Sequence, residues 1–156
     1  MPFSLAHELS RIAAALAAEG IEYALCGGLA VAVHGFPRAT RDLDFLVREG
    51  DLTRIQPVLD RLGFTLPAGI IPFDVGKETE RRIYRVSKAE GEDLLTLDLL
   101  LVTPVLEEVW AGRETYEVGN QGIQVVSRAG LGQMKRAAGR PQDLADLEQL
   151  GLDERE

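Results

Sequence analysis

Two aspartates interrupt an otherwise apolar stretch of this chain, the phrase DLDFLV at residues 42–47. The stretch is predicted to be a strand, so Asp42 and Asp44 would project from the same face. Two carboxylates side by side repel each other, and burying them uncompensated is costly. A divalent cation compensates both, and oxygen ligands suit Mg²⁺ or Mn²⁺. The alternative is an exposed strand end where both acids pair with Arg38 and Arg41.

A third aspartate, Asp98, stands in the leucine-rich phrase LLTLDLLLV. An acid in so apolar a strand needs a partner. Three aspartates on neighbouring strands could hold two metal ions, which activate an attacking hydroxyl and stabilise a leaving pyrophosphate. Asp98 could also take the proton of that hydroxyl. The alternative is an aspartate at a strand end, held in a salt bridge.

Gly27 and Gly28 follow the short apolar run that ends at Cys26 and precede an expected helix. A glycine turn lets the backbone approach phosphates closely, with free N–H groups at the helix start. A tight strand-to-helix turn without a ligand explains the same pattern. We expect Cys26 to pack as a small core residue and His34 to face a loop or the core rather than a metal.

The elements that must position these residues alternate along the chain. Ser4 and Gly20 bound an expected first helix. Strands are predicted at 21–26 and 42–47, and a hairpin joins 81–87 to 94–102. Residues around 119–120 form a second hairpin or a tight turn before a strand. Helices are predicted at 29–35, 51–64 and 104–112, with a final pair at 128–138 and 141–150. Residues 66–80, with two prolines and two glycines, favour a loop with at most one short strand. The order predicts an α/β or α+β domain around a mixed sheet.

Composition narrows the function class. The chain has 156 residues, 46% hydrophobic and 27% charged, which suits one globular domain. Its apolar runs are too short to span a bilayer and its start does not resemble a signal peptide, so no membrane partner is expected. The single cysteine excludes an internal disulfide, and a cytoplasmic protein is expected.

The net charge of −8 argues against wrapping a long nucleic acid. This charge does not exclude binding to one end of an RNA, or binding of a nucleotide through metal ions. Four basic residues, Arg81, Arg82, Arg85 and Lys88, lie on or beside one predicted strand. They indicate a solvated face, with an acceptor-RNA contact as the alternative.

Together these motifs resemble the DNA polymerase β-type nucleotidyltransferase superfamily. The pattern is Cys26-Gly27-Gly28, thirteen further residues, Asp42-Leu43-Asp44-Phe45, and the distant Leu97-Asp98-Leu99. The whole phrase is more similar to abortive-infection (AbiEii/AbiGii-like) and related uncharacterised bacterial nucleotidyltransferases than to polymerases. The tail, MKRAAGRPQDLADLEQL, places Lys135, Arg140 and Asp143 at matching positions. Gly28 departs from the serine that many active members carry after the first glycine.

The resemblance implies a nucleotidyltransferase-like mixed sheet flanked by helices, with a short C-terminal helical pair. It also implies that residues 1–156 form a single minimal nucleotidyltransferase domain. Gly27 and Gly28 would hold the triphosphate, with Arg38, Arg41 and Arg140 as further nucleotide contacts. Asp42, Asp44 and Asp98 would bind Mg²⁺ or Mn²⁺. Lys135 would reach the phosphates or base, and Asp143 would orient Lys135 or the acceptor; the alternative for these two is a surface salt bridge between consecutive helices.

The function expected from the resemblance is metal-dependent transfer of a nucleoside monophosphate from an NTP to a hydroxyl. The acceptor would be an RNA end, a protein or a small molecule, and the enzyme could be toxin-like with an antitoxin partner. One alternative is a non-catalytic nucleotide- or partner-binding module of a toxin–antitoxin pair. Another is a nucleotide-sugar glycosyltransferase, whose metal site also uses Asp-x-Asp; the chain is short for that class.

Overall fold

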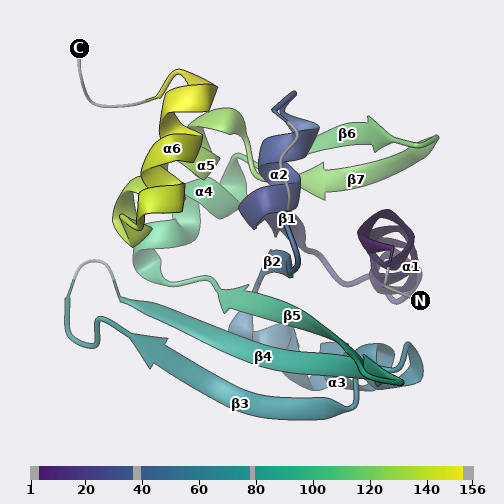
Figure 1. The fold of residues 1–156 in the computed structure, drawn as a ribbon. Coiled ribbons are helices and arrows are strands. Elements are labelled where there is room, and N and C mark those ends of the chain that lie inside the picture. Colours follow the sequence, from purple (N-terminus) through teal and green to yellow (C-terminus); the bar gives the residue numbers. More distant parts are fainter. Residues whose placement is uncertain (1–3, 37–39, 78–79, 153–156) are drawn as a thin grey trace.

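The computed structural model describes residues 4–36, 40–77 and 80–152, and these residues form one seven-stranded mixed sheet with helices on both sides (Figure 1). The strands run β3 (Leu66–Phe73), β4 (Arg81–Glu90), β5 (Asp93–Leu101), β2 (Leu43–Val47), β1 (Ala24–Cys26), β7 (Gln121–Val125) and β6 (Glu114–Val118) across the sheet. The β2–β5 and β1–β7 pairs are parallel and the other pairs antiparallel. The predicted fold class is confirmed.

The helices cover the two faces of the sheet separately. The helices are α1 (Leu5–Ala18), α2 (Gly27–Val33), α3 (Leu52–Arg61), α4 (Glu107–Ala111), α5 (Arg128–Ala138) and α6 (Pro141–Leu150), with short 3₁₀ turns at Glu49–Asp51 and Pro104–Leu106. Figure 1 shows α2 and the C-terminal helices α4 to α6 on one side, with α3 behind the strands. The expected caps are present: Ser4 accepts from His7 N and Ser127 from Gly130 N.

The edge strand β3 differs from the expected loop. It runs for eight residues beside β4, with a register shift between Pro67 and Gly69. Prolines are tolerated there because an edge strand has one row of N–H groups without a strand partner. The one strand that the sequence allowed here is thus an edge strand of eight residues, longer than expected, and the loop begins only after Phe73. The consequence for the site is that the β3–β4 hairpin forms one wall beside β5.

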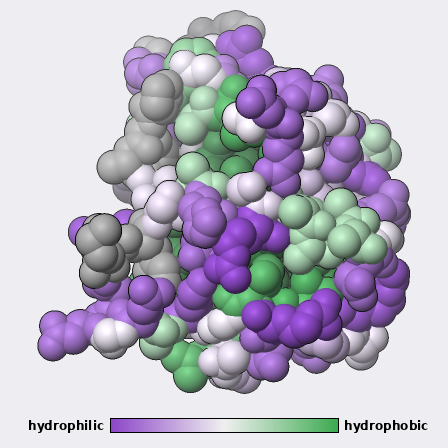
Figure 2. Space-filling model, turned by 90° about the vertical axis from the view of Figure 1, so that its right-hand side faces the viewer, coloured by the Kyte–Doolittle hydropathy of each residue, from purple (hydrophilic) through white to green (hydrophobic). Residues whose placement is uncertain are grey.

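The core lies between the sheet and its helices. Phe45, Leu97 and Leu99 are among the side chains with at most 1% exposure, and Cys26 is buried as expected. Figure 2, seen from the side of α1, shows mostly hydrophilic side chains with hydrophobic ones in a central region between them. Within the described residues, no helix is long and apolar enough to cross a membrane.

Candidate active site

Asp44 and Asp98 lie side by side on two parallel strands. The register pairs Asp44 of β2 directly with Asp98 of β5, and Cys26 of β1 lies on the other flank of Asp44. Residues at the same level of neighbouring strands point to the same face of a sheet. The structure thus brings together two acids that are 54 positions apart in the sequence, both on the wall of one cleft.

Burial and neighbouring negative charges disfavour the ionised form of the Asp44 side chain. The pKa of Asp44 is raised to about 7, chiefly by burial and then by the negative charges of Asp98 and Asp42, against the opposing effect of Lys135 and Arg140. Such a carboxyl lacks a compensating cation. A positive ion bound beside it would restore the charged form at neutral pH.

The backbone at Gly27 packs closely against the side chain of Asp44. It adopts φ +70°, which glycine tolerates far better than other residues, and a Cβ built on it would lie 2.2 Å from Asp44 Oδ2. The helix α2 begins at Gly27 itself, so the glycines form its first turn rather than a loop before it. Gly27 lines the cleft, whereas Gly28 is buried in the helix and is not among the lining residues.

Arg85 occupies both oxygens of Asp98. Its Nε donates to Oδ1 at 2.8 Å and its Nη2 to Oδ2 at 3.0 Å, across the antiparallel β4–β5 pair. A carboxylate offers about four lone-pair positions, so this pairing leaves Asp98 able to accept two further hydrogen bonds. Asp98 is 8% exposed and lies mid-strand. It does form a salt bridge, but not at a strand end.

Lys135 is the centre of a buried charge cluster between α5 and α6. Its Nζ lies 2.9 Å from Asp146 Oδ2 and 3.4 Å from Asp143 Oδ1, and all three residues are at most 5% exposed. Asp143 also accepts from Arg140 through Nε at 2.7 Å and through the backbone N–H at 3.1 Å. The alternative of a surface salt bridge is therefore wrong, because Lys135 and Asp143 form their ion pair in the protein interior.

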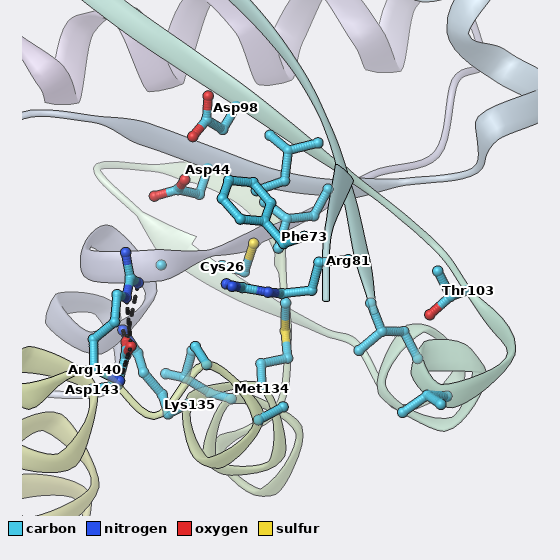
Figure 3. A pocket seen from close by; sticks show the side chains of 18 of the residues that line it. Cys26, Asp44, Phe73, Arg81, Asp98, Thr103, Met134, Lys135, Arg140 and Asp143 are labelled. Carbon is cyan, nitrogen blue, oxygen red and sulfur yellow. Dashed lines mark hydrogen bonds and ion pairs between the residues drawn. The ribbon is translucent and has the colours of Figure 1, made fainter. Parts of the chain in front are cut away.

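A cleft of about 210 Å³ joins these groups. In Figure 3, Asp44 and Asp98 lie on one side, Lys135, Arg140 and Asp143 on another, and Phe73 and Arg81 between them. The rest of the wall is largely apolar, with Ile83, Leu100, Val105, Leu106, Leu131 and Met134. A polar end suited to phosphates thus adjoins an apolar space suited to a ring or a carbon skeleton.

Two further predicted site residues, like Gly28, do not line this cleft. Asp42 is exposed and precedes β2, although its charge acts on Asp44. Arg41 is exposed and is not part of the cleft wall. Arg38 lies outside the described residues. Among the residues that the structure does describe, no group of three or more histidine, cysteine, aspartate or glutamate side chains is already arranged to hold a metal.

The basic residues of β4 divide between the two faces of the strand. Arg82 pairs with Glu49, and Lys88 donates to Glu8 at 3.0 Å in a buried pair. Arg81 and Arg85 face the cleft on the other side. The expectation of one solvated basic face was wrong, because strand alternation separates odd from even positions. His34 lies outside the cleft, with Nε2 2.9 Å from Val126 O.

A family profile described as "uncharacterised nucleotidyltransferase" matches residues 3–130. The chain belongs to this family. It is therefore a nucleotidyltransferase, which agrees with the broad resemblance of its motifs. No match to a curated protein was found. The narrower likeness to AbiEii/AbiGii-like proteins has no support in these comparisons.

Solved structures of nucleotidyltransferases share the fold. A candidate nucleotidyltransferase from Thermotoga maritima superposes with a TM-score of 0.62 at 14% identity, covering 92% of this chain and 89% of that one. ANT(2″)-Ia, solved in complex with adenylyl-2″-tobramycin, gives 0.61 at 14% identity, with 94% and 86% covered. JHP933 from Helicobacter pylori gives 0.50 at 21% identity, with 96% and 67% covered. At these identities the likeness concerns the fold.

Proposed function

We propose that this nucleotidyltransferase transfers a nucleoside monophosphate from an NTP to a hydroxyl group, with a divalent metal ion, in the cleft that contains Asp44 and Asp98. The observation that supports this most strongly is the register of β2 and β5, which aligns the two acids above a glycine that has no room for a side chain. Paired carboxylates beside a close-approaching backbone suit a metal-bound triphosphate.

The donor set fits Mg²⁺ or Mn²⁺. Asp44 is a hard oxygen ligand whose charged form needs a cation, and Asp42 is near enough for its charge to raise the pKa of Asp44. Asp98 can contribute an oxygen as third ligand because Arg85 leaves lone pairs on both of its oxygens. When bound, the metal would neutralise phosphate oxygens and the leaving pyrophosphate.

The chain's own residues would supply orientation and proton transfer. The acceptor hydroxyl oxygen attacks the α-phosphorus, the bond to the pyrophosphate breaks, and the hydroxyl proton passes to Asp98. Arg85 fixes the plane of that carboxylate by its two hydrogen bonds. Gly27 admits the triphosphate beside Asp44, and Gly28 shapes the same turn of α2.

Lys135 and Arg140 would set the positive side of the cleft. Lys135 is held between Asp143 and Asp146, which agrees with the proposed role of Asp143 in orienting it. Arg140 lines the cleft and shares Asp143, so both cations are positioned by one buried carboxylate. Both cations would contact the triphosphate, and Arg38 and Arg41 would add further nucleotide contacts.

A labelling experiment tests the proposed function. The enzyme is incubated with Mg²⁺ and each of the four α-³²P-labelled NTPs, separately with total RNA, a protein extract and a small-molecule extract. Label is expected in one acceptor class, and Asp44→Asn should lose it. Absence of label from all three classes, with intact NTP binding, would contradict transfer and favour the non-catalytic module.

The toxin-like role and the antitoxin partner belong to the same proposal. They rest on the resemblance of the phrase from Gly27 to Val47 and of the α5–α6 tail to AbiEii/AbiGii-like sequences. Growth arrest on expression of the wild-type chain, absent with Asp44→Asn, is the expected result. Equal growth of both strains would remove the toxin hypothesis and leave nucleotidyl transfer untouched.

A further inference from the structure

Arg81 is a cation in the cleft that has no ion-pair partner among the described residues. Its Nε is shielded from solvent and has no hydrogen-bond partner, and no acidic side chain among residues 4–36, 40–77 and 80–152 pairs with it. Glu80, next to it, accepts instead from Gly76 N at 2.9 Å. A shielded N–H donor without an acceptor is costly, and an oxyanion in the cleft that accepted from it would remove that cost.

Phe73 packs against this guanidinium. The two residues are directly paired across the β3–β4 ladder, and the Arg81 Cζ lies 4.9 Å from the centre of the Phe73 ring. A cation held over an aromatic face has fewer accessible conformations, which favours this placement of its donors. Figure 3 shows the group reaching into the cleft between the aspartate pair and Met134.

Most other charged side chains of the cleft already have charged partners, and Glu80 accepts from the Gly76 N–H. Arg85 is bound to Asp98, while Arg140 and Lys135 are bound to Asp143. A polycationic substrate would therefore find these carboxylates occupied, and Asp44 would be engaged by the metal. Arg81 is left as the group that can select a substrate by charge.

The position of Arg81 favours the acceptor over the triphosphate. Arg85 is opposite Asp98, the proposed proton acceptor, and Arg81 starts four residues away on the same face of β4. At about 3.3 Å per residue, the two Cα atoms are about 13 Å apart along the strand. A hydroxyl near Asp98 and an anionic group near Arg81 would thus fit one small acceptor, or one nucleotide of a larger one.

Resting on the proposed function, we propose that Arg81, held by Phe73, binds an anionic oxygen group on the acceptor, a phosphate or a carboxylate. The enzyme would then modify a hydroxyl of an anionic molecule and discriminate against polycations. This assigns Arg81 as a specificity-determining residue for the acceptor.

The test measures binding to the enzyme after its triphosphate site has been filled. Wild type, Arg81→Met and Arg82→Met are saturated with Mg²⁺ and a non-hydrolysable NTP analogue. Each is then titrated with ribose 5-phosphate against ribose, with glycerate against glycerol, and with the polycation tobramycin. Arg82 is the matched control because it is the next residue and pairs with Glu49 on the opposite face. Arg81→Lys serves as a second variant that keeps the charge if Arg81→Met does not fold.

In the wild type, one anionic probe should bind about 10- to 100-fold more tightly than its neutral parent, the range of a charge-assisted contact. The phosphate and carboxylate arms tell which group is preferred. Arg81→Met should lose this preference and keep its affinity for the NTP analogue, while Arg82→Met keeps both. Equal binding of anionic and neutral probes in wild type, or tighter binding of tobramycin, would overturn the inference alone.

A loss of analogue affinity in Arg81→Met, with the anion preference intact, would also overturn the inference, because Arg81 would then belong to the triphosphate site. Failure of the wild type to bind the analogue in Mg²⁺ would overturn the proposed function together with the inference.

Discussion

Replacing Lys135 by methionine should destabilise the fold far more than the loss of a surface ion pair. The lysine is 5% exposed, and its ammonium lies 2.9 Å from Asp146 and 3.4 Å from Asp143, which are 2% and 1% exposed. Removing it takes the ammonium away from Asp146 Oδ2, while Gln142 Nε2 still donates to Oδ1 at 3.0 Å. Breaking a buried pair typically costs about 3–5 kcal/mol, against about 0–1 kcal/mol at a surface.

Urea unfolding of wild type and Lys135→Met at pH 7 measures this loss. The double variant Lys135→Met/Asp146→Asn should recover about half of it, because the uncompensated charge is then removed. A loss below about 1 kcal/mol for Lys135→Met would refute the buried-cluster account, since that value is typical of a solvated pair.

The same comparison has a pH dependence with a defined sign. Burial acts to raise the pKa of Asp143, but the hydrogen bond from Arg140 and the charges of Lys135 and Arg140 outweigh it and lower the pKa. A lowered pKa contributes stability above the unfolded-state value, about 3.9, that is lost as the pH falls through the folded-state value. The difference between wild type and Lys135→Met should therefore be largest near neutral pH and shrink below about pH 4.

Three further predictions concern the aspartate pair. Gly27→Ala should destabilise the protein by more than the control Gly20→Ala. Both positions have positive φ, which costs about 1–2 kcal/mol in alanine, but only an alanine at position 27 would also clash with Asp44. Equal losses of stability in thermal unfolding would contradict the close approach of Gly27 to Asp44. In metal-free protein, the raised pKa of Asp44, about 7, contributes stability below about pH 4 that is lost as the pH rises through 7, and Asp44→Asn should abolish this fall in urea titrations; an unchanged pH profile would refute it. Asp98→Asn should lower single-turnover transfer about 10²-fold or more per folded molecule with NTP binding retained, whereas an unchanged rate would remove Asp98 from catalysis.

Local signals in the sequence were sufficient for most of the elements around the site. The bounds of α5 and α6 follow from the cap at Ser127, the glycine at 139 and the proline at 141. The hairpin around Gly119 and Asn120 follows from its turn residues. These features depend on a few adjacent residues, so a single sequence contains the necessary information.

The contacts of Asp98 depended on register, which is partly local. The β4–β5 hairpin turns at Gly91 and Glu92, so Glu90 pairs with Asp93 and Arg85 falls opposite Asp98. A prediction that had narrowed the turn to those two residues would have identified this ion pair. The parallel pairing of Asp44 with Asp98 has no such local signal, because the two strands are separated by α3 and the β3–β4 hairpin.

The sequence pattern could not predict the burial of Lys135 or the direction in which the Arg81 side chain points. A lysine in a helix usually lies at the surface, and only the packing of α6 against α5 encloses Lys135 with two aspartates. Arg81 was predicted to belong to a solvated basic face. Strand alternation places Arg81 and Arg82 on opposite faces, but the sequence does not tell which face of the strand lines a cleft.

The most direct measurement is a calorimetric titration of a non-hydrolysable NTP analogue into wild type and Asp44→Asn, each with and without Mg²⁺. The site described here predicts that wild type binds the analogue only weakly until Mg²⁺ is present, and that Asp44→Asn remains folded but loses the Mg²⁺-dependent gain. Equal affinity with and without Mg²⁺ in wild type, or an undiminished gain in Asp44→Asn, would contradict the assignment of this cleft as a metal-dependent nucleotidyltransferase site.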